Sequence, residues 1–257
     1  MSLKFFVKTG LYRLTPGGFG PYRHLRRQRD PGYVHERDQH PIRRKHHHKE
    51  GWKSLVAGGV CYRDYADYEE YVTHQRLKFD EMLKLAGGFS NAVVADYRLK
   101  FYRRFRRVPQ WLPRDARIVC AGARQGTEVE VLRDLGFRNA VGIDLNPGPR
   151  NPFVKPGDFM RMEFETSSVD LVYSNCVDHA FELEAFFAEH ARVLKPDGYA
   201  MYDLPVGQPR RPFEAVAWDT EETLFVMMLR SFQQIVRVEH DREWTWIVLH
   251  GKRRHAS

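Results

Sequence analysis

The pattern of apolar and polar positions changes character at about residue 116. Beyond it, apolar residues three and four positions apart predict helices over 126–136, 181–194 and 219–231. Apolar runs with the length of buried strands alternate with them, over 117–121, 139–144, 169–174, 198–204, 233–239 and 243–250. This alternation predicts a parallel sheet built from βαβ units. Only His240–Glu243 separate the last two strands, so we expect an antiparallel hairpin there.

The first 112 residues follow a different pattern. Apolar residues recur at helical spacing from Asp67 to about Leu85 and from Asn91 to Arg106, which predicts two helices. Residues 1–60 show few periodic segments and are punctuated by Pro and Gly, which predicts an extended or partly disordered arm. The predicted organisation is an irregular basic arm over 1–60, a helical lid or cap over 61–112, an α/β domain over 113–252 and a tail over 253–257.

Positive charge is concentrated in the arm. Residues 1–50 contain 12 Lys and Arg against 4 Asp and Glu, whereas the rest of the chain contains 29 of each sign. This excess is compatible with binding to RNA phosphates or to an anionic membrane surface, and a solvated extension is the default alternative. The arginine-rich cluster Arg103–Arg107 could extend the same surface.

The cysteines and the lengths of the apolar runs indicate the cellular compartment of the protein. Cys61, Cys120 and Cys176 are odd in number and widely spaced, which favours reduced thiols in a cytosolic setting. No apolar run approaches the roughly 18 residues of a membrane span, and the first residues have too short an apolar stretch for a secretory signal. We therefore expect a cytoplasmic protein, with peripheral attachment to a membrane as an open alternative.

The segment Arg117–Gly148 carries the most specific chemistry in the chain. A strand-like run, Ile118–Ala121, leads into a turn bounded by Gly122 and Gly126, and the next strand ends at Asp144. Backbone N–H groups and a carboxylate then meet at the carboxyl edge of the sheet, where α/β folds bind nucleoside cofactors. Because three residues separate the two glycines, the turn does not match the GxGxxG motif of nicotinamide-dependent enzymes.

Five segments resemble, in sequence order, the motifs of the class I S-adenosylmethionine-dependent methyltransferases, in the group often called type 11. They are the glycine turn Gly122–Gly126, Asp144, Gly157–Met160, Ser167–Asn175 and Glu189–Gly198. The resemblance covers about residues 110–250, and its most specific segment is the helix end EHARVLKPDG at Glu189–Gly198. The resemblance implies an α/β fold with a Rossmann-like, doubly wound sheet of seven strands whose last strand is antiparallel. It also implies methyl transfer as the activity and S-adenosylmethionine as the cofactor.

The resemblance also implies roles for individual residues. Asp144 corresponds to the acid that accepts hydrogen bonds from both ribose hydroxyls, and Asp158 to the acid that faces the adenine amino group. A plain turn residue is the alternative for both, and Pro-Gly-Asp before Phe159 is ordinary turn chemistry. The cofactor-binding residues implied in this way are Gly122, Ala123, Arg124, Gly126, Asp144, Leu145, Asp158, Phe159 and Asn175.

Two positions depart from the family's pattern. The first motif usually carries an acid where this chain has Cys120, and a central glycine where it has Arg124. Cofactor binding must therefore manage without the usual acid. The guanidinium of Arg124 could contact the methionine carboxylate of the cofactor, and a solvated loop arginine is the alternative.

The candidate for proton removal follows the strand at 169–174. His179 is the candidate catalytic base, because an imidazole with a pKa of about 6.5 suits proton abstraction at neutral pH. A histidine that only packs at the helix entry is the alternative. We expect Asp178 to cap the helix or to touch the acceptor, and not to face His179. Cys176 lacks the preceding proline of the pyrimidine C5 methyltransferases, so we expect it to be a packing residue.

No metal site is predicted, because His46–His48 lie in a basic, loop-like segment without a carboxylate or cysteine at ligand spacing. We expect these histidines to be solvated.

The function that we predict is methyl transfer from S-adenosylmethionine to a small-molecule or glycan-like acceptor, at oxygen. The helix around Tyr65–Tyr71 is expected to act as a lid that selects the acceptor. Two alternatives stay open. One is an RNA methyltransferase that uses the basic arm; the other is a cofactor-binding scaffold without chemistry, motivated by Cys120 and Arg124. The sequence does not predict the oligomeric state.

Overall fold

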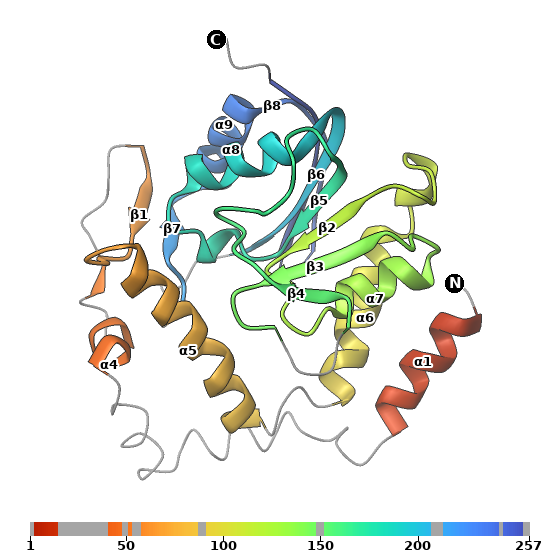
Figure 1. The fold of residues 1–257 in the computed structure, drawn as a ribbon, viewed down its shortest axis with the longest axis horizontal. Coiled ribbons are helices and arrows are strands. Elements are labelled where there is room, and N and C mark those ends of the chain that lie inside the picture. The colour runs from red at the N-terminus through yellow and green to blue at the C-terminus, as the bar shows by residue number, and fades with distance from the viewer. Residues whose placement is uncertain are drawn as a thin grey trace.

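A seven-stranded sheet forms the centre of the molecule (Figure 1). The computed structural model describes residues 3–14, 41–47, 51–52, 58–86, 91–147, 152–206, 213–241 and 244–253. The strand order is β4-β3-β2-β5-β6-β9-β8. The bounds are β2 (Ile118–Ala121), β3 (Ala140–Asp144), β4 (Val154–Pro156), β5 (Val169–Ser174), β6 (Leu194–Pro205), β8 (Phe232–His240) and β9 (Trp244–Lys252).

Strands β2 to β6 run parallel to one another, and β9 runs antiparallel to both β6 and β8. The Rossmann-like sheet with an antiparallel last strand is therefore confirmed, and so is the hairpin at its end. Strand β4 was not predicted, because only Val154 of its three residues is buried. The other six strands lie where the apolar runs predict them.

One face of the sheet is covered by α8 (Leu183–Val193) and α9 (Glu221–Ser231). Phe186, Phe187 and Met228 on these helices are fully buried against the sheet. Burial of each such side chain stabilises the fold by roughly 1.5–3 kcal/mol. Helix α8 begins after Glu182, whose carboxylate accepts hydrogen bonds from the N–H groups of the first turn and so caps the helix.

The opposite face is covered by α6 (Asn91–Phe105) and α7 (Thr127–Asp134). Phe101, Phe105 and Val129 pack there against buried side chains of β2, β5, β6 and β9. The site described below lies beside both helices, so this packing helps to position it.

A buried ion pair fastens α6 to the sheet. Nε of Arg104 donates to Asp203 at 2.8 Å, and the hydroxyl of Tyr173 donates to the other oxygen of that carboxylate at 2.7 Å. Arg104 also pairs with Asp241. The surface role considered for the cluster Arg103–Arg107 is therefore wrong for Arg104, which is 7% exposed.

A second, two-stranded sheet was not predicted. Strand β1 (Val60–Tyr62) pairs antiparallel with β7 (Val216–Trp218), which follows β6 along the chain. Helix α5 (Tyr68–Ala86) begins directly after β1. The small sheet thus ties the start of the predicted lid region to the loop region beyond the carboxyl end of β6.

The irregular arm predicted over 1–60 is wrong for two described segments. Residues Leu3–Leu14 form helix α1, and Pro41–His47 form helix α4. Gly10 interrupts the apolar pattern of the first segment, which is why the sequence did not predict a helix there. The arm residues between 15 and 40 lie outside the described part of the chain.

Tertiary contacts stabilise α1. Its Phe5 is buried, and the centroid of that ring lies 4.4 Å from the ring centroid of Tyr102 in α6. Nζ of Lys8 lies 2.8 Å from a carboxylate oxygen of Asp134 in α7. A short helix is marginal in isolation, so these contacts supply what the local pattern lacks. Figure 1 shows α1 beside α6 and α7 and on the opposite side of the molecule from α5.

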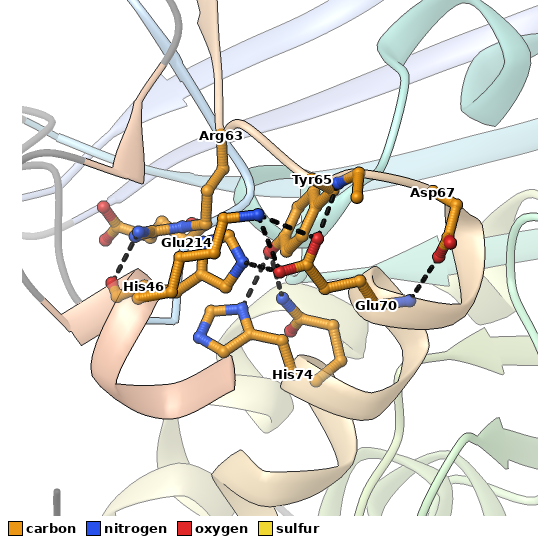
Figure 2. A network of polar contacts seen from close by, with 10 residues as sticks. His46, Arg63, Tyr65, Asp67, Glu70, His74 and Glu214 are labelled. Atoms are coloured by element: carbon orange, nitrogen blue, oxygen red, sulfur yellow. Dashed lines mark hydrogen bonds and ion pairs between the residues drawn. The ribbon is translucent and has the colours of Figure 1, made fainter. Parts of the chain in front are cut away.

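Helix α4 docks on α5 through Glu70 (Figure 2). The carboxylate of Glu70 accepts hydrogen bonds from Lys45 Nζ at 2.9 Å and from the backbone N–H of Ala66 at 2.6 Å. It also lies 2.9 Å from Nε2 of His46. Although burial opposes ionisation, these donors lower the pKa of Glu70 to about 2.

His46 is fully buried, so the expectation that the histidine tract is solvated is wrong for this residue. Its ring centroid lies 4.7 Å from that of Tyr65 and 4.9 Å from that of His74, and burial lowers its pKa. Nη1 of Arg63 donates to the His46 carbonyl at 2.6 Å, as Figure 2 shows. The side chain of His47 and all of His48 lie outside the described residues.

We expect Glu70→Gln to lower the free energy of unfolding at pH 7 by about 1 kcal/mol, because it removes the charge that Lys45 contacts. The folded-state pKa lies below the ordinary value of 4.5, so the charged carboxylate stabilises the fold above that pH. The contribution is lost as the pH falls toward 2.

Urea denaturation of wild type and variant at pH 7 and pH 3 measures this effect. The difference between their midpoint urea concentrations should be smaller at pH 3. The exposed neighbour Glu69 supplies the control, since Glu69→Gln should change little at either pH. Equal midpoint shifts for the two variants would contradict the assignment.

Candidate active site

The turn between β2 and α7 is built on two glycines in the left-handed region. Gly122 has a φ of 77° and Gly126 a φ of 71°, and Gly126 is the N-cap residue of α7. A Cβ added to Gly122 would lie 2.8 Å from the sulfur of Cys176, so no larger residue fits there. The N–H groups of Gly122 and Ala123 both donate to the carbonyl of Ile143, at 2.9 and 3.0 Å.

Asp144 at the end of β3 is held by the same turn. One carboxylate oxygen accepts a hydrogen bond from the backbone N–H of Arg124, and the other accepts one from the N–H of Asn146, each at 2.9 Å. Burial raises the pKa of this carboxyl despite the two donors. The acid and the turn therefore lie side by side at the carboxyl edge of the sheet, as the sequence predicts.

Asp158 lies against helix α5. Its carboxylate accepts a hydrogen bond from the N–H of Met160 at 2.8 Å and another from the hydroxyl of Tyr68. The guanidinium of Arg161 stacks over the Tyr68 ring at 4.6 Å from the ring centroid. Since Tyr68 belongs to α5, the predicted lid helix contacts the predicted adenine site directly.

Arg124 lies at the boundary of two small cavities at the strand ends, of about 40 and 50 Å³. Organic ligands occupy pockets of about 300–1,000 Å³, so binding a nucleoside cofactor requires the Arg124 side chain or α5 to shift. Arg124 has a φ of 48°, which is unfavourable for any residue except glycine and explains the glycine usual in the family.

The two cavities bring together most of the predicted cofactor residues. Their linings include Gly122, Ala123, Arg124, Asp144, Leu145, Phe159 and Asn175. Gly126 and Asp158 lie beside these cavities without lining them.

Helix α5 contributes two lining residues that the sequence did not indicate, Gln75 and Lys78. Nζ of Lys78 contacts Nε2 of His179, and Nε2 of Gln75 donates to the backbone carbonyl of Phe213 at 3.0 Å. A signal for both was present in the spacing, because they continue the helical stripe that begins with Tyr68 and Tyr71.

His179 has a defined orientation. Its Nδ1 lies 2.8 Å from the carbonyl of Phe213, which can only accept, so Nδ1 carries the proton and Nε2 faces Lys78 with its lone pair. Burial and the Lys78 ammonium hold the pKa of His179 well below its usual value. Burial also lowers the pKa of Lys78 to about 8. The cavity thus contains a neutral imidazole next to an easily deprotonated amine.

The structure corrects the predicted surroundings of His179. Val177–His179 form one turn of 3₁₀-helix, and α8 begins only after Glu182, so Asp178 is not the N-cap of that helix. The tighter turn brings a carboxylate oxygen of Asp178 to 3.7 Å from Nε2 of His179, so these adjacent residues do approach each other.

The remaining expectations concern cysteine and metal chemistry. Cys176 is buried, and burial raises the pKa of its thiol to about 12, which agrees with a packing residue and not with a nucleophile. Within the described residues, no group of three His, Cys, Asp or Glu side chains is arranged to hold a metal ion.

A family model described as a methyltransferase domain matches residues 119–202, from β2 to β6. This range contains the glycine turn, both predicted acids and the carboxyl end of β5. Over the residues that it matches, the comparison supports a class I S-adenosylmethionine-dependent methyltransferase. S-adenosylmethionine is accordingly the cofactor of the family to which this site belongs.

Comparison with individual proteins adds detail. Sterol 24-C-methyltransferase of Schizosaccharomyces pombe is 28% identical over 172 residues, which are 60% of this chain and 43% of that protein. The corresponding enzyme of Saccharomyces cerevisiae is 47% identical over 53 residues, which are 20% of this chain and 14% of its own. The matches therefore span less than half the length of these relatives.

The fold is shared with solved methyltransferases. A Burkholderia thailandensis 1,6-didemethyltoxoflavin-N1-methyltransferase, bound to its substrate and S-adenosylhomocysteine, superposes with a TM-score of 0.56 at 13% identity. The superposition covers 78% of this chain and 98% of that one. At this identity the likeness concerns the fold alone.

We expect Asp144→Ala to weaken S-adenosylmethionine binding by about tenfold or more, because it removes a charged acceptor that backbone donors orient. Isothermal titration calorimetry measures the affinity. Asp197→Asn, an exposed position in β6, is the matched control and should bind as wild type does. Unchanged binding by the Asp144 variant would refute its predicted role.

Proposed function

We propose that the chain transfers a methyl group from S-adenosylmethionine to a hydroxyl group of a small-molecule or glycan-like acceptor. The observation that carries this proposal is the contact between Lys78 and His179 in the cavity that Asp144 and Phe159 also line. Such a pair next to a nucleoside site supplies the proton removal that an oxygen acceptor needs.

The cofactor, when bound, supplies an electrophilic methyl group on a sulfonium. Arg124 and Asp144 would hold the cofactor, and a hydroxyl acceptor that took up this methyl group would have to lose its proton. In our proposal this proton passes to the amine of Lys78. His179 is then the positioning partner, because its Nδ1–H is held by Phe213 and its Nε2 contacts the amine.

Aromatic side chains behind this pair hold α5 in place. Tyr71 packs against Tyr65, Tyr68 and Phe181, with ring centroids 5.5, 5.3 and 5.2 Å away. Its hydroxyl donates to the backbone carbonyl of His179 at 3.0 Å. We propose that this part of α5 selects the acceptor. The sterol methyltransferases matched above act, by name, on a small molecule, which supports the same class.

The alternative of an RNA methyltransferase is less favoured by the described contacts. Lys8 pairs with Asp134 and Lys45 pairs with Glu70, so these two arm charges are engaged within the molecule. A peripheral membrane role for the arm stays a prediction. None of the described helices is long and apolar enough to span a bilayer.

A screen identifies the acceptor and tests the scaffold alternative. The protein is incubated with S-adenosylmethionine and a cell extract, and products heavier by one methylene unit are detected by mass spectrometry. A protein that binds the cofactor but yields no such product from any extract fraction would favour the scaffold. An acceptor methylated at carbon or nitrogen would refute the oxygen assignment.

With the acceptor in hand, Lys78→Met should slow methyl transfer by about 10²–10⁴-fold. The wild-type rate should rise with pH and level off above about 8, because the amine must lose its proton before it can accept another. The variant should lose this pH dependence. The charged and titratable groups around the pair are Arg124, Asp144, Cys176, Asp178 and His74.

The control for this variant is Lys155→Met, which removes an exposed lysine of β4 and should leave the profile unchanged. Since His179 acts through Lys78, His179→Gln should shift the midpoint of the pH profile in addition to lowering the rate. If the Lys78 variant keeps the wild-type rate and pH profile, the proposed mechanism is wrong.

A further inference from the structure

Position 120 is a cysteine in this chain, so it supplies no carboxylate to the cofactor site. The methionine end of S-adenosylmethionine carries a carboxylate and an ammonium group, and Arg124 can contact only the carboxylate. The acid that usually stands at the position of Cys120 is missing in this chain. A nearby carboxylate stabilises a buried cation, so another acid close to that strand is a candidate partner for the ammonium group.

Glu128 is such an acid. It lies in the first turn of α7, two residues after Gly126, and is only 5% exposed. It lines the cavity that Gly122, Arg124 and Asn175 also line. An acid in the first turn of a helix is ordinarily solvated and serves the helix dipole. Burial toward a cavity is not needed for that role.

The carboxyl group of Glu128 affects the pKa of Cys120 in β2, the strand that lacks the usual acid. Burial and the nearby charge of Glu128 together raise the pKa of the Cys120 thiol. The same carboxyl contributes to the raised pKa of Tyr173 in the neighbouring strand β5, after burial and Asp203. The charge of Glu128 is therefore felt at β2 and β5, and its side chain lines the cavity at their carboxyl ends.

The charges around Glu128 are mixed, because Arg124 favours its carboxylate whereas Asp144 and Glu130 oppose it. Its neighbour on the same helix, Glu130, accepts a hydrogen bond from Arg98 at 2.8 Å. Burial destabilises the charged form of a carboxyl group. Burial accordingly raises the pKa of Glu128 to about 8.

We propose that Glu128 replaces the missing acid at Cys120 and binds the ammonium group of the methionine end of S-adenosylmethionine. Arg124 then binds the carboxylate and Glu128 the ammonium group of this zwitterionic end. The inference rests on the proposed function only through the cofactor, and it does not depend on the acceptor.

The inference predicts proton release on binding. At neutral pH the free protein carries a protonated Glu128, and the arriving ammonium group ionises it, so about one proton is released per cofactor bound. The charged and titratable groups that face Glu128 are Arg124, Asp144, Glu130, Cys120 and Tyr173.

Two probes separate the methionine end from the nucleoside end. S-adenosylhomocysteine carries the ammonium and carboxylate groups, whereas 5′-methylthioadenosine lacks both. By titration calorimetry we expect Glu128→Gln to weaken S-adenosylhomocysteine binding about 10- to 100-fold, the effect of one charge-assisted hydrogen bond. Binding of 5′-methylthioadenosine should not change. Titrations in buffers of different ionisation enthalpy should show proton release for wild type and none for the variant.

Glu130→Gln is the matched control on the same helix and should bind both probes as wild type does. Folding is checked by urea denaturation. The pKa of Glu128 is raised in the folded state, so the wild type loses stability as the pH rises from 4.5 to about 8, where only the unfolded chain gives up this proton. Glu128→Gln should lack this loss and should become more stable relative to the wild type over that range.

Each outcome is decisive. Equal weakening of both probes by Glu128→Gln would assign the residue a structural role and overturn the inference, as would unchanged affinity for S-adenosylhomocysteine. Equal affinity of the wild type for 5′-methylthioadenosine and S-adenosylhomocysteine would also overturn the inference. The assignment of the nucleoside-binding residues would then still stand. If wild type binds neither probe, the cofactor assignment itself fails and the inference fails with it.

Discussion

The site depends on the backbone hydrogen bonds that join the turn after β2 to the end of β3. The N–H groups of Gly122 and Ala123 share the Ile143 carbonyl, and the next N–H, that of Arg124, donates to Asp144. This close approach leaves no room for a side chain at Gly142, where a Cβ would lie 2.6 Å from that of Ala123. Because two adjacent parallel strands end here, the turn and the acid share one edge of the sheet.

Helix α5 forms the other wall of the site, and remote segments hold it there. Helix α4 docks on it through Glu70, while Tyr68, Gln75 and Lys78 reach Asp158, Phe213 and His179. The cavity between these walls is small, so the cofactor and α5 must adjust to each other. A substitution in the network of Figure 2 would therefore act on the site at a distance, through the placement of α5.

Where the sequence-based predictions succeeded, the physical signal was local. Six of the strands and the helices that follow them are visible as buried runs and helical spacing, and the glycine turn is visible because left-handed backbone needs glycine. Where they failed, long-range contacts decided. Helix α1 forms against α6 despite Gly10, His46 is buried by α5, and Asp178 turns toward His179 because the helix starts later than expected.

The sequence by itself determined the fold class, the family, and the position of the turn and of Asp144, since each depends on residues close together in the chain. Only the tertiary structure brought Lys78 to His179 across 101 residues, and only it buried Glu128 beside the strand that lacks the usual acid. Both depend on how helices pack against the sheet edge. A helical pattern predicts which residues share a face, but the neighbour of that face follows from the packing of the whole molecule.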